Sequence, residues 1–161
     1  MSSRGIWGAW VVCLALAIAG CASKPAKPVE TKAEWSASAD VNPDSAGRPS
    51  PIVVRIYQLR GDTEFNNADF FALYEKDKDI LGASLIAREE KTLFPGQQLE
   101  TDLPLSPEAR FVGVVAAFRE LGTSRWRALI GRPEKSLLKV LATQRVYIRV
   151  GKDAVTLSDK N

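Results

Sequence analysis

Alternation of apolar and polar side chains constrains the fold of this 161-residue chain more than any other feature of its sequence. From residue 33 onward, apolar residues occupy every second position, as Ala33, Trp35 and Ala37 do, while polar residues fill the positions between them. Successive side chains of a β-strand point to opposite faces, so this period of two gives each strand one buried and one solvated face. The pattern therefore predicts a mainly β fold.

Turn residues divide this region into short strands, which we expect at residues 33–39, 51–59, 84–93, 98–105, 111–118, 124–130, 145–150 and 154–157. Residues 111–118 are apolar on both faces, which is typical of a central strand buried from both sides. The strands at 84–93 and 98–105 flank Pro95-Gly96 and are predicted to form a hairpin. Many short strands at such spacing indicate an antiparallel β-sandwich.

One segment, at about residues 65–82, departs from the strand pattern and predicts a short amphipathic helix. Helical spacing recurs in Phe70, Leu73 and Tyr74. The N-terminal cap is expected at Asn66 or Asn67, and the helix is expected to end at Gly82. Residues 133–142 fit either a second helix or a loop, because Pro133 suits both the first helical position and a turn.

The N-terminal residues have the pattern of an export signal. Arg4 precedes an apolar run at residues 6–19 and then small residues, in the order of a secretory signal peptide. Ile18-Ala19-Gly20-Cys21 resembles the lipobox of bacterial lipoproteins, with a plain secretion signal or a buried helix with an incidental cysteine as alternatives. The lipobox implies that residues 1–20 are removed, that the Cys21 sulfur carries diacylglycerol and that its new amine carries an N-acyl chain.

The expected mature chain begins with a lipidated tether at residues 21–32, which is rich in lysine and proline. The β-sandwich domain then occupies residues 33–161. Cys13 lies in the signal and Cys21 carries lipid, so no disulfide is expected and an apolar core must supply the stability. In enterobacterial lipoproteins, aspartate directly after the lipidated cysteine favours retention at the inner membrane. This chain has Ala22 at that position, so we expect the protein to be sorted to the outer membrane.

Composition narrows the possible functions. The chain has no histidine, which excludes Ser/His and Cys/His catalysis and the usual zinc and copper ligand sets. Its net charge is only +3, and its basic residues do not form the concentrated stripe that binding to nucleic-acid phosphates requires. Glu89 and Glu90 point to opposite faces of a strand, and these residues, like Asp77 and Asp79, fit a solvated face. We therefore expect that the protein is not an enzyme, that it carries no metal and no cofactor beyond covalent lipid, and that it does not bind nucleic acid.

Two aromatic groups fit either packing or ligand binding. The first comprises Phe65, Phe70, Phe71 and Tyr74. These side chains could line a pocket, but packing a helix onto a sheet is far more common. Trp126, between Arg125 and Arg127, could stack on a sugar or a cation, although a strand with one polar face predicts the same pattern.

The connection between the first two expected strands carries the most informative motif. It comprises Asn42, Pro43, Asp44, Ser45, Ala46, Gly47, Arg48, Pro49 and Ser50. These residue types supply turn chemistry, and the prolines stiffen the segment, which lowers the entropy cost of ordering it on a partner. A long connection with no role would have the same composition.

This connection and several later motifs resemble the TssJ family, the outer-membrane lipoprotein of the bacterial type VI secretion system. The likeness spans nearly all of residues 41–130. The similar motifs are Asn42-Pro43-Asp44-Ser45-Ala46-Gly47-Arg48-Pro49-Ser50-Pro51, Val53-Val54-Arg55-Ile56-Tyr57-Gln58-Leu59, Ala68-Asp69-Phe70-Phe71-Ala72-Leu73-Tyr74, Leu81-Gly82, Pro95-Gly96, Val112-Gly113-Val114-Val115-Ala116-Ala117-Phe118-Arg119 and Trp126-Arg127.

The resemblance implies a transthyretin-like antiparallel β-sandwich with a small helical insertion and no catalysis. It also implies a structural lipoprotein in the inner leaflet of the outer membrane, within a trans-envelope complex with TssL and TssM. In that family, the loop between the first two strands is implicated in binding the periplasmic C-terminal region of the inner-membrane protein TssM.

Mapped onto this chain, residues 42–50 would contact a TssM-like protein. Asp44 and Arg48 would be the polar contacts, and Pro43 and Pro49 would fix the loop shape. The alternative is a lipid-anchored periplasmic ligand-binding module or enzyme inhibitor that uses the region of Trp126.

Lipid attachment at Cys21 can be tested by fractionation. Replacing Cys21 with serine removes the only sulfur that could carry diacylglycerol in the expected mature chain, so Cys21→Ser should move the protein from the membrane to the soluble fraction. Persistence of the Cys21→Ser protein in the membrane fraction would contradict the anchor.

Overall fold

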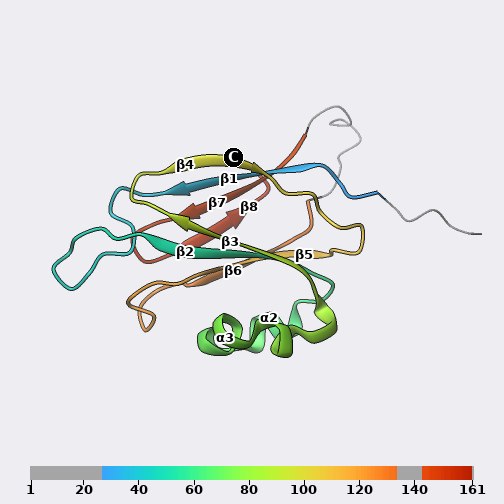
Figure 1. The fold of residues 1–161 in the computed structure, drawn as a ribbon, viewed down its shortest axis with the longest axis horizontal. Coiled ribbons are helices and arrows are strands. Elements are labelled where there is room, and N and C mark those ends of the chain that lie inside the picture. The colour runs from blue at the N-terminus through green and yellow to red at the C-terminus, as the bar shows by residue number, and fades with distance from the viewer. Residues whose placement is uncertain (1–26, 134–142, 161) are drawn as a thin grey trace, which may run out of the picture.

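Two four-stranded sheets and a helical insertion make up the fold, which is described by a computed structural model over residues 27–133 and 143–160 (Figure 1). The proposed signal, Cys21 and all but the first residue of segment 133–142 lie outside the described residues. The elements in chain order are β1 (Thr31–Ala37), β2 (Ile52–Leu59), α2 (Thr63–Asn67), α3 (Phe70–Leu81), η2 (Gly82–Ser84), β3 (Leu85–Leu93), β4 (Gln98–Asp102), β5 (Phe111–Ala116), β6 (Arg127–Gly131), β7 (Gln144–Val150) and β8 (Val155–Ser158).

The predicted sandwich with a helical insertion is confirmed, but its sheets are not wholly antiparallel. One sheet has the strand order β4-β1-β7-β8 and the other the order β3-β2-β5-β6. β1 pairs with β7 in parallel, from Thr31 opposite Gln144 to Ala37 opposite Val150. Periodicity fixes which face of each strand is buried, whereas the direction of its neighbour depends on how the chain returns to the sheet, so the parallel pair was missed.

The hairpin predicted from residues 84–93 and 98–105 is wrong. β3 pairs with β2 and β4 pairs with β1, so the chain crosses from one sheet to the other at the turn between them. Gly96, with a φ of +73°, makes the reversal and donates its N–H to the carbonyl of Ser38. A turn dipeptide reverses the chain, but the inward-facing side chains of the two strands decide which sheet each strand joins.

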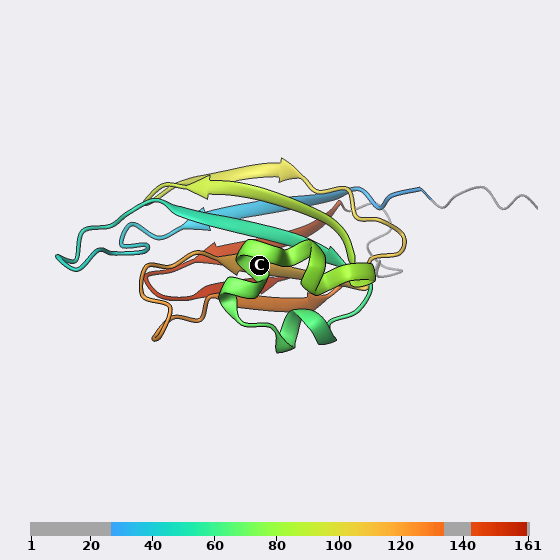
Figure 2. The same ribbon diagram turned by 60° about the horizontal axis from the view of Figure 1, so that its bottom comes forward.

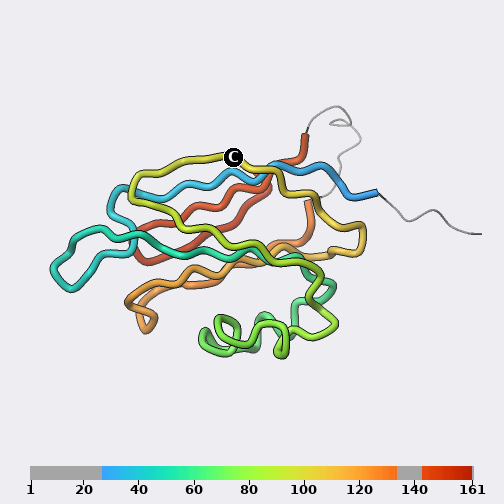
Figure 3. The backbone as a smooth tube through the Cα atoms, in the orientation of Figure 1, coloured from blue at the N-terminus to red at the C-terminus, as the bar shows by residue number. Residues whose placement is uncertain are grey.

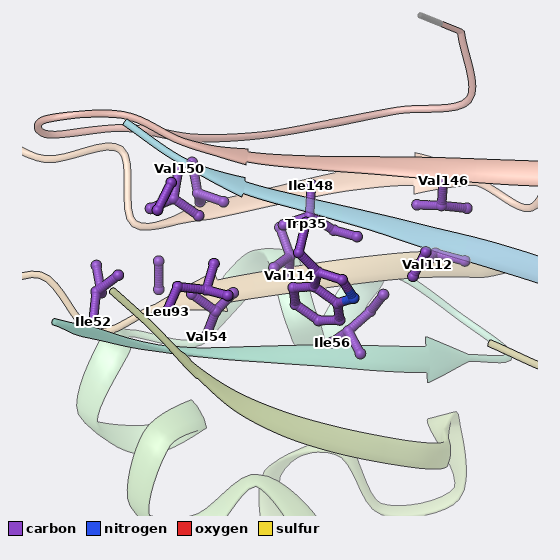
Figure 4. Close-up of a cluster of buried hydrophobic side chains, with 14 of the residues drawn as sticks. Trp35, Ile52, Val54, Ile56, Leu93, Val112, Val114, Val146, Ile148 and Val150 are labelled. Atoms are coloured by element: carbon purple, nitrogen blue, oxygen red, sulfur yellow. The ribbon is translucent and has the colours of Figure 1, made fainter. Parts of the chain in front are cut away.

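The core lies between the two sheets and is centred on Trp35. Its side chain is 1% exposed and is surrounded in Figure 4 by Ile56 and Val114 of one sheet and Ile148 of the other. The indole N–H is also satisfied, because it donates to Thr101 Oγ1 at 3.0 Å. A buried tryptophan removes roughly 150–250 Å² of surface from water, so this side chain joins both sheets.

The helical insertion covers the outer face of the β3-β2-β5-β6 sheet and forms a second apolar cluster there (Figure 2). The sequence predicted one helix, but the structure has two, because the backbone is extended at Ala68 between α2 and α3. The predicted cap at Asn66 or Asn67 is wrong, since Asp69 caps α3 by accepting the amide of Ala72 at 2.9 Å. The predicted end at Gly82 is confirmed, with a φ of +46°.

Gly113 of β5 allows the insertion to approach the sheet. A Cβ atom at this position would lie 2.8 Å from Cζ of Phe65, which is fully buried and packs edge-on against Tyr57. Because that separation is shorter than carbon atoms tolerate, only glycine leaves room for the ring of Phe65.

Substituting Gly113 should therefore destabilise the protein. We expect Gly113→Ala to lower the free energy of unfolding by about 1–3 kcal/mol, measured by urea denaturation. Gly122→Ala is the matched control, because its Cβ would meet no atom within 4 Å. Phe65→Leu in the Gly113→Ala background should restore part of the loss, and equal stability of the two glycine variants would contradict the close approach.

Candidate functional site

The connection at residues 42–50 projects from one end of the sandwich between β1 and β2 (Figures 1 and 3). The described chain begins with Lys27 at the opposite end (Figure 3). Asn42 and Ser50 are buried at the base of the loop, and Pro43 and Asp44 are half-buried. The exposed tip consists of Ser45, Ala46, Gly47, Arg48 and Pro49.

Asp44 organises the tip of the loop through both of its carboxylate oxygens. Oδ1 accepts the amides of Ala46 and Arg48, each at 2.9 Å. Oδ2 accepts a hydrogen bond from Nε of Arg48 at 2.8 Å and also lies 2.8 Å from Nη2, so two guanidinium nitrogens form an ion pair with one carboxylate oxygen. Gly47, at a φ of +76°, donates its amide to the carbonyl of Asp44 and completes the turn.

This network neutralises the charge of Asp44 inside the loop. Hydrogen bonds from the backbone and then the side chain of Arg48 lower the pKa of Asp44 below its ordinary value. The side chain of Asp44 is 20% exposed, whereas that of Arg48 is 80% exposed. Of the two polar contacts predicted from the sequence, Asp44 thus shapes the loop, and Arg48 remains accessible to a partner.

Asn42 fixes the base of the loop to the rest of the sandwich. It is 4% exposed and adopts a φ of +47°, a conformation that asparagine tolerates better than most residues. Its Nδ2 donates to the carbonyl of Pro51 and its Oδ1 accepts the amide of Arg119, both at 2.9 Å. Its own amide donates to the carbonyl of Lys152 at 3.1 Å.

These contacts bring four connections together at one end of the molecule. Through Asn42 the loop is joined to the β5–β6 and β7–β8 connections, and through Ser38 it is joined to the β3–β4 turn. The sequence identified Asn42 as a turn former but not as the residue that links these segments. The only signal was chemical, because an asparagine side chain both donates and accepts.

A pocket of about 150 Å³ opens beside the base of the loop. The aromatic ring of Phe118, which is 5% exposed, contributes apolar surface to it. The lining residues are Asn42, Pro43, Phe118, Glu120, Thr123, Ser124, Lys152 and Asp153. Three connections that are far apart in the sequence thus create a concave surface next to the predicted partner-binding loop.

The aromatic candidates serve packing in this structure, except Phe71, which is 61% exposed. Phe65 and Phe70 are buried under the insertion, and Tyr74 stacks on Phe70 with ring centroids 5.2 Å apart. Trp126 packs edge-on against Phe70, and the guanidinium of Arg127 lies 4.8 Å from its ring centroid. The indole of Trp126 is therefore occupied by its own neighbours.

The carboxylates considered as acid or base groups are held in ion pairs or dispersed. Asp77 is 4% exposed, and its Oδ2 accepts from Arg88 at 2.5 Å and from the hydroxyl of Tyr57 at 3.3 Å. Burial raises the pKa of Tyr57 to about 12. Glu90 pairs with Arg55 at 2.5 Å.

Within residues 27–133 and 143–160, no group of three acidic side chains is placed to hold a metal ion. No described helix is long and apolar enough to cross a membrane.

The shape of the loop should depend on the charge of Asp44. Because its pKa is lower in the folded chain, its contribution is complete above the unfolded pKa, near about 4, and is lost as the pH falls through the lowered value. Protection of the Ala46 and Arg48 amides from hydrogen exchange should fall over that range and should be absent at every pH in Asp44→Ala. Retained protection in Asp44→Ala would contradict this role, and a carboxyl titration of Asp44 by NMR checks its pKa.

Known proteins resemble the chain over most of its length. The family described as "Type VI secretion lipoprotein, VasD, EvfM, TssJ, VC_A0113" matches residues 30–153. The T6SS lipoprotein TssJ1 from Pseudomonas aeruginosa is 30% identical, with a TM-score of 0.74 over 83% of this chain and 98% of that chain. Serratia marcescens Lip, described as a membrane bound component of the Type VI Secretion System, is 30% identical, with a TM-score of 0.73 over 83% and 99%.

A chain of the structure described as "T6SS protein TssM C-terminal domain (869-1107) from EAEC" is also 30% identical. Its TM-score is 0.63, and the match covers 80% of this chain and 97% of that chain. No curated protein sequence matches the chain. The family match and the two lipoprotein structures agree with the sandwich described above, and the chain belongs to the type VI secretion lipoprotein family that includes TssJ.

Proposed function

We propose that this protein is a structural, non-catalytic lipoprotein that joins the outer membrane to an inner-membrane partner of the type VI secretion system. The observation that carries the proposal is the position of the rigid loop at residues 42–50, at the end of the sandwich opposite Lys27. A lipid attached upstream of Lys27 would hold one end of the domain at the membrane. The loop would then face the periplasm.

The anchor proposed for this arrangement is Cys21, with diacylglycerol on its sulfur and an N-acyl chain on its amine. Each buried methylene contributes about 0.8 kcal/mol to membrane binding, so several acyl chains hold a protein far more firmly than one. The residues between Cys21 and Lys27 would reach about 20 Å if fully extended. That length lets the domain stand clear of the periplasmic face of the outer membrane.

The proposed partner is the periplasmic C-terminal region of a TssM-like inner-membrane protein, within a complex that includes TssL. Support comes from the EAEC structure, whose description names a TssM fragment, residues 869–1107, that is longer than our whole chain. The chain matched in that structure is shorter than ours, because the match covers 97% of it and 80% of ours. The matched chain is therefore shorter than the named fragment, which supports association of a chain of this kind with TssM.

The geometry of the loop suits a binding role. Ordering a flexible loop on a partner costs free energy, and this cost falls when the bound shape already exists in the free protein. The Asp44–Arg48 network and the base fixed by Asn42 supply such a shape. The alternative ligand-binding role through Trp126 gains no support from the structure, because Phe70 and Arg127 pack against that indole.

Replacing the loop tip tests the proposal. Residues 43–49 replaced by a Gly/Ser segment of equal length, with Asn42 and Ser50 kept, should weaken binding of the partner's periplasmic region at least about tenfold, because the rigid shape and Arg48 are lost. The control carries Glu75→Ala and Lys78→Ala, two exposed changes on α3. Binding is measured with the full lipidated chain in detergent. Unchanged affinity of a loop variant that melts like the wild type would overturn the loop assignment.

A further inference from the structure

The loop tip alone offers little surface for tight binding. Ser45, Ala46 and Gly47 have small side chains, and the carboxylate of Asp44 is occupied within the loop. Interfaces draw most of their binding energy from a few aromatic or arginine side chains packed in pockets, and seldom from serine. Arg48 is the single residue of that kind in the tip. Stronger contacts must therefore come from the segments beside the loop.

Phe94 is a large apolar side chain that is 56% exposed. It belongs to the β3–β4 turn, which is bonded to the chain just before the loop. Gly96 donates its amide to the carbonyl of Ser38 at 3.1 Å, and Ala37 donates its amide to the carbonyl of Gln97 at 2.9 Å. The turn is also fixed internally, because the amide of Phe94 donates to Oε1 of Gln97 at 2.9 Å. The aromatic ring is thus presented on a rigid support.

The pocket beside Pro43 lies at the base of the loop, among the β5–β6 and β7–β8 connections. Its volume of about 150 Å³ is comparable to that of a cavity that holds benzene, so one leucine or phenylalanine side chain would fit. Phe118 and Pro43 offer it apolar contacts, and Lys152 and Asp153 also line it. Asn42 and Pro43 belong to both the pocket and the loop, so the two surfaces are continuous.

We propose that the periplasmic partner binds a three-part surface, made of the loop tip, the exposed ring of Phe94 and the pocket lined by Phe118. In this arrangement, Phe94 packs into an apolar recess of the partner, and an apolar side chain of the partner fills the pocket. The inference rests on the proposed function, because it names further contacts of the same binding site. The partner has one apolar recess and one projecting leucine, methionine or aromatic side chain, separated by the span of the loop.

The position of the surface favours a protein from the inner membrane over the lipid of the outer membrane. The β3–β4 turn that contains Phe94, the loop at residues 42–50 and the β5–β6 and β7–β8 connections that line the pocket lie at the end of the sandwich opposite the start of the described chain (Figure 1). An exposed aromatic ring that inserted into the anchoring membrane would have to lie at the other end. The same placement leaves the surface open to a protein that crosses the periplasm.

Substituting Phe94 tests the first contact, and the chain offers a matched control. Phe71, on α3, is 61% exposed and is not part of the loop end. We expect Phe94→Ala to weaken binding of the purified periplasmic region of the TssM-like partner at least about tenfold, and Phe71→Ala to change it less than about twofold. Both variants should unfold at the wild-type temperature, since each removes an exposed ring.

Filling the pocket tests the second contact. Thr123→Trp places a large ring in the pocket, and Thr63→Trp places the same ring at an exposed position of α2. The first should weaken binding at least about tenfold, and the second should leave it unchanged. Normal affinity of both Phe94→Ala and Thr123→Trp, together with lost affinity of the loop-tip variant, would overturn this inference and leave the proposed function intact.

Two further outcomes would count against the three-part surface, and the first of them would also count against the loop assignment. Normal affinity of the loop-tip variant, Phe94→Ala and Thr123→Trp would overturn the inference and the loop assignment in the proposed function together. Analytical ultracentrifugation of the same proteins detects self-association. If Phe94→Ala dissociates a dimer of this chain without changing its affinity for the partner, the surface is a contact between copies, and the inference is overturned.

Discussion

In the described residues the two sheets of this sandwich are held together by side-chain packing and not by a disulfide, and the rest of the structure depends on that packing. The described residues contain no cysteine, so interdigitated side chains such as Trp35, Val114 and Ile148 must hold the sheets in register. Protein interiors are packed as densely as organic crystals, and shape complementarity of this kind fixes relative positions firmly. The same packing positions the end of the sandwich that carries the loop at residues 42–50, because the four connections at that end leave from strands of both sheets.

A rigid core does not by itself make a rigid loop. The loop at residues 42–50 gains its order from polar contacts, with the Asp44–Arg48 ion pair in the tip and Asn42 at the base. The lipid proposed at Cys21 and the binding surface would occupy opposite ends of one stiff body. Such an arrangement suits a protein that joins a membrane to a larger assembly. The family to which this chain belongs consists of lipoproteins of the type VI secretion system.

Much of the fold could be predicted from local patterns. The strand positions, the central strand β5 and the end of α3 at Gly82 follow from periodicity and turn chemistry, which depend on neighbouring residues. The hairpin predicted around Pro95-Gly96 was wrong because both flanking strands have one apolar face, and that pattern does not distinguish between two sheets. The cap of α3 was displaced to Asp69 because the chain between the two helices is extended at Ala68.

By itself, the sequence determined which side chains face the core and where the loop lies, since consecutive residues encode the period of a strand and the chemistry of a turn. Only the tertiary structure decided what surrounds the loop. The amide of Arg119 reaches Asn42 across 77 positions of sequence, and the turn that contains Phe94 is fixed near the loop because Gln97 and Gly96 bond to Ala37 and Ser38. Such contacts form because separate strands end at the same edge of the sandwich, and no local pattern specifies which connections meet there.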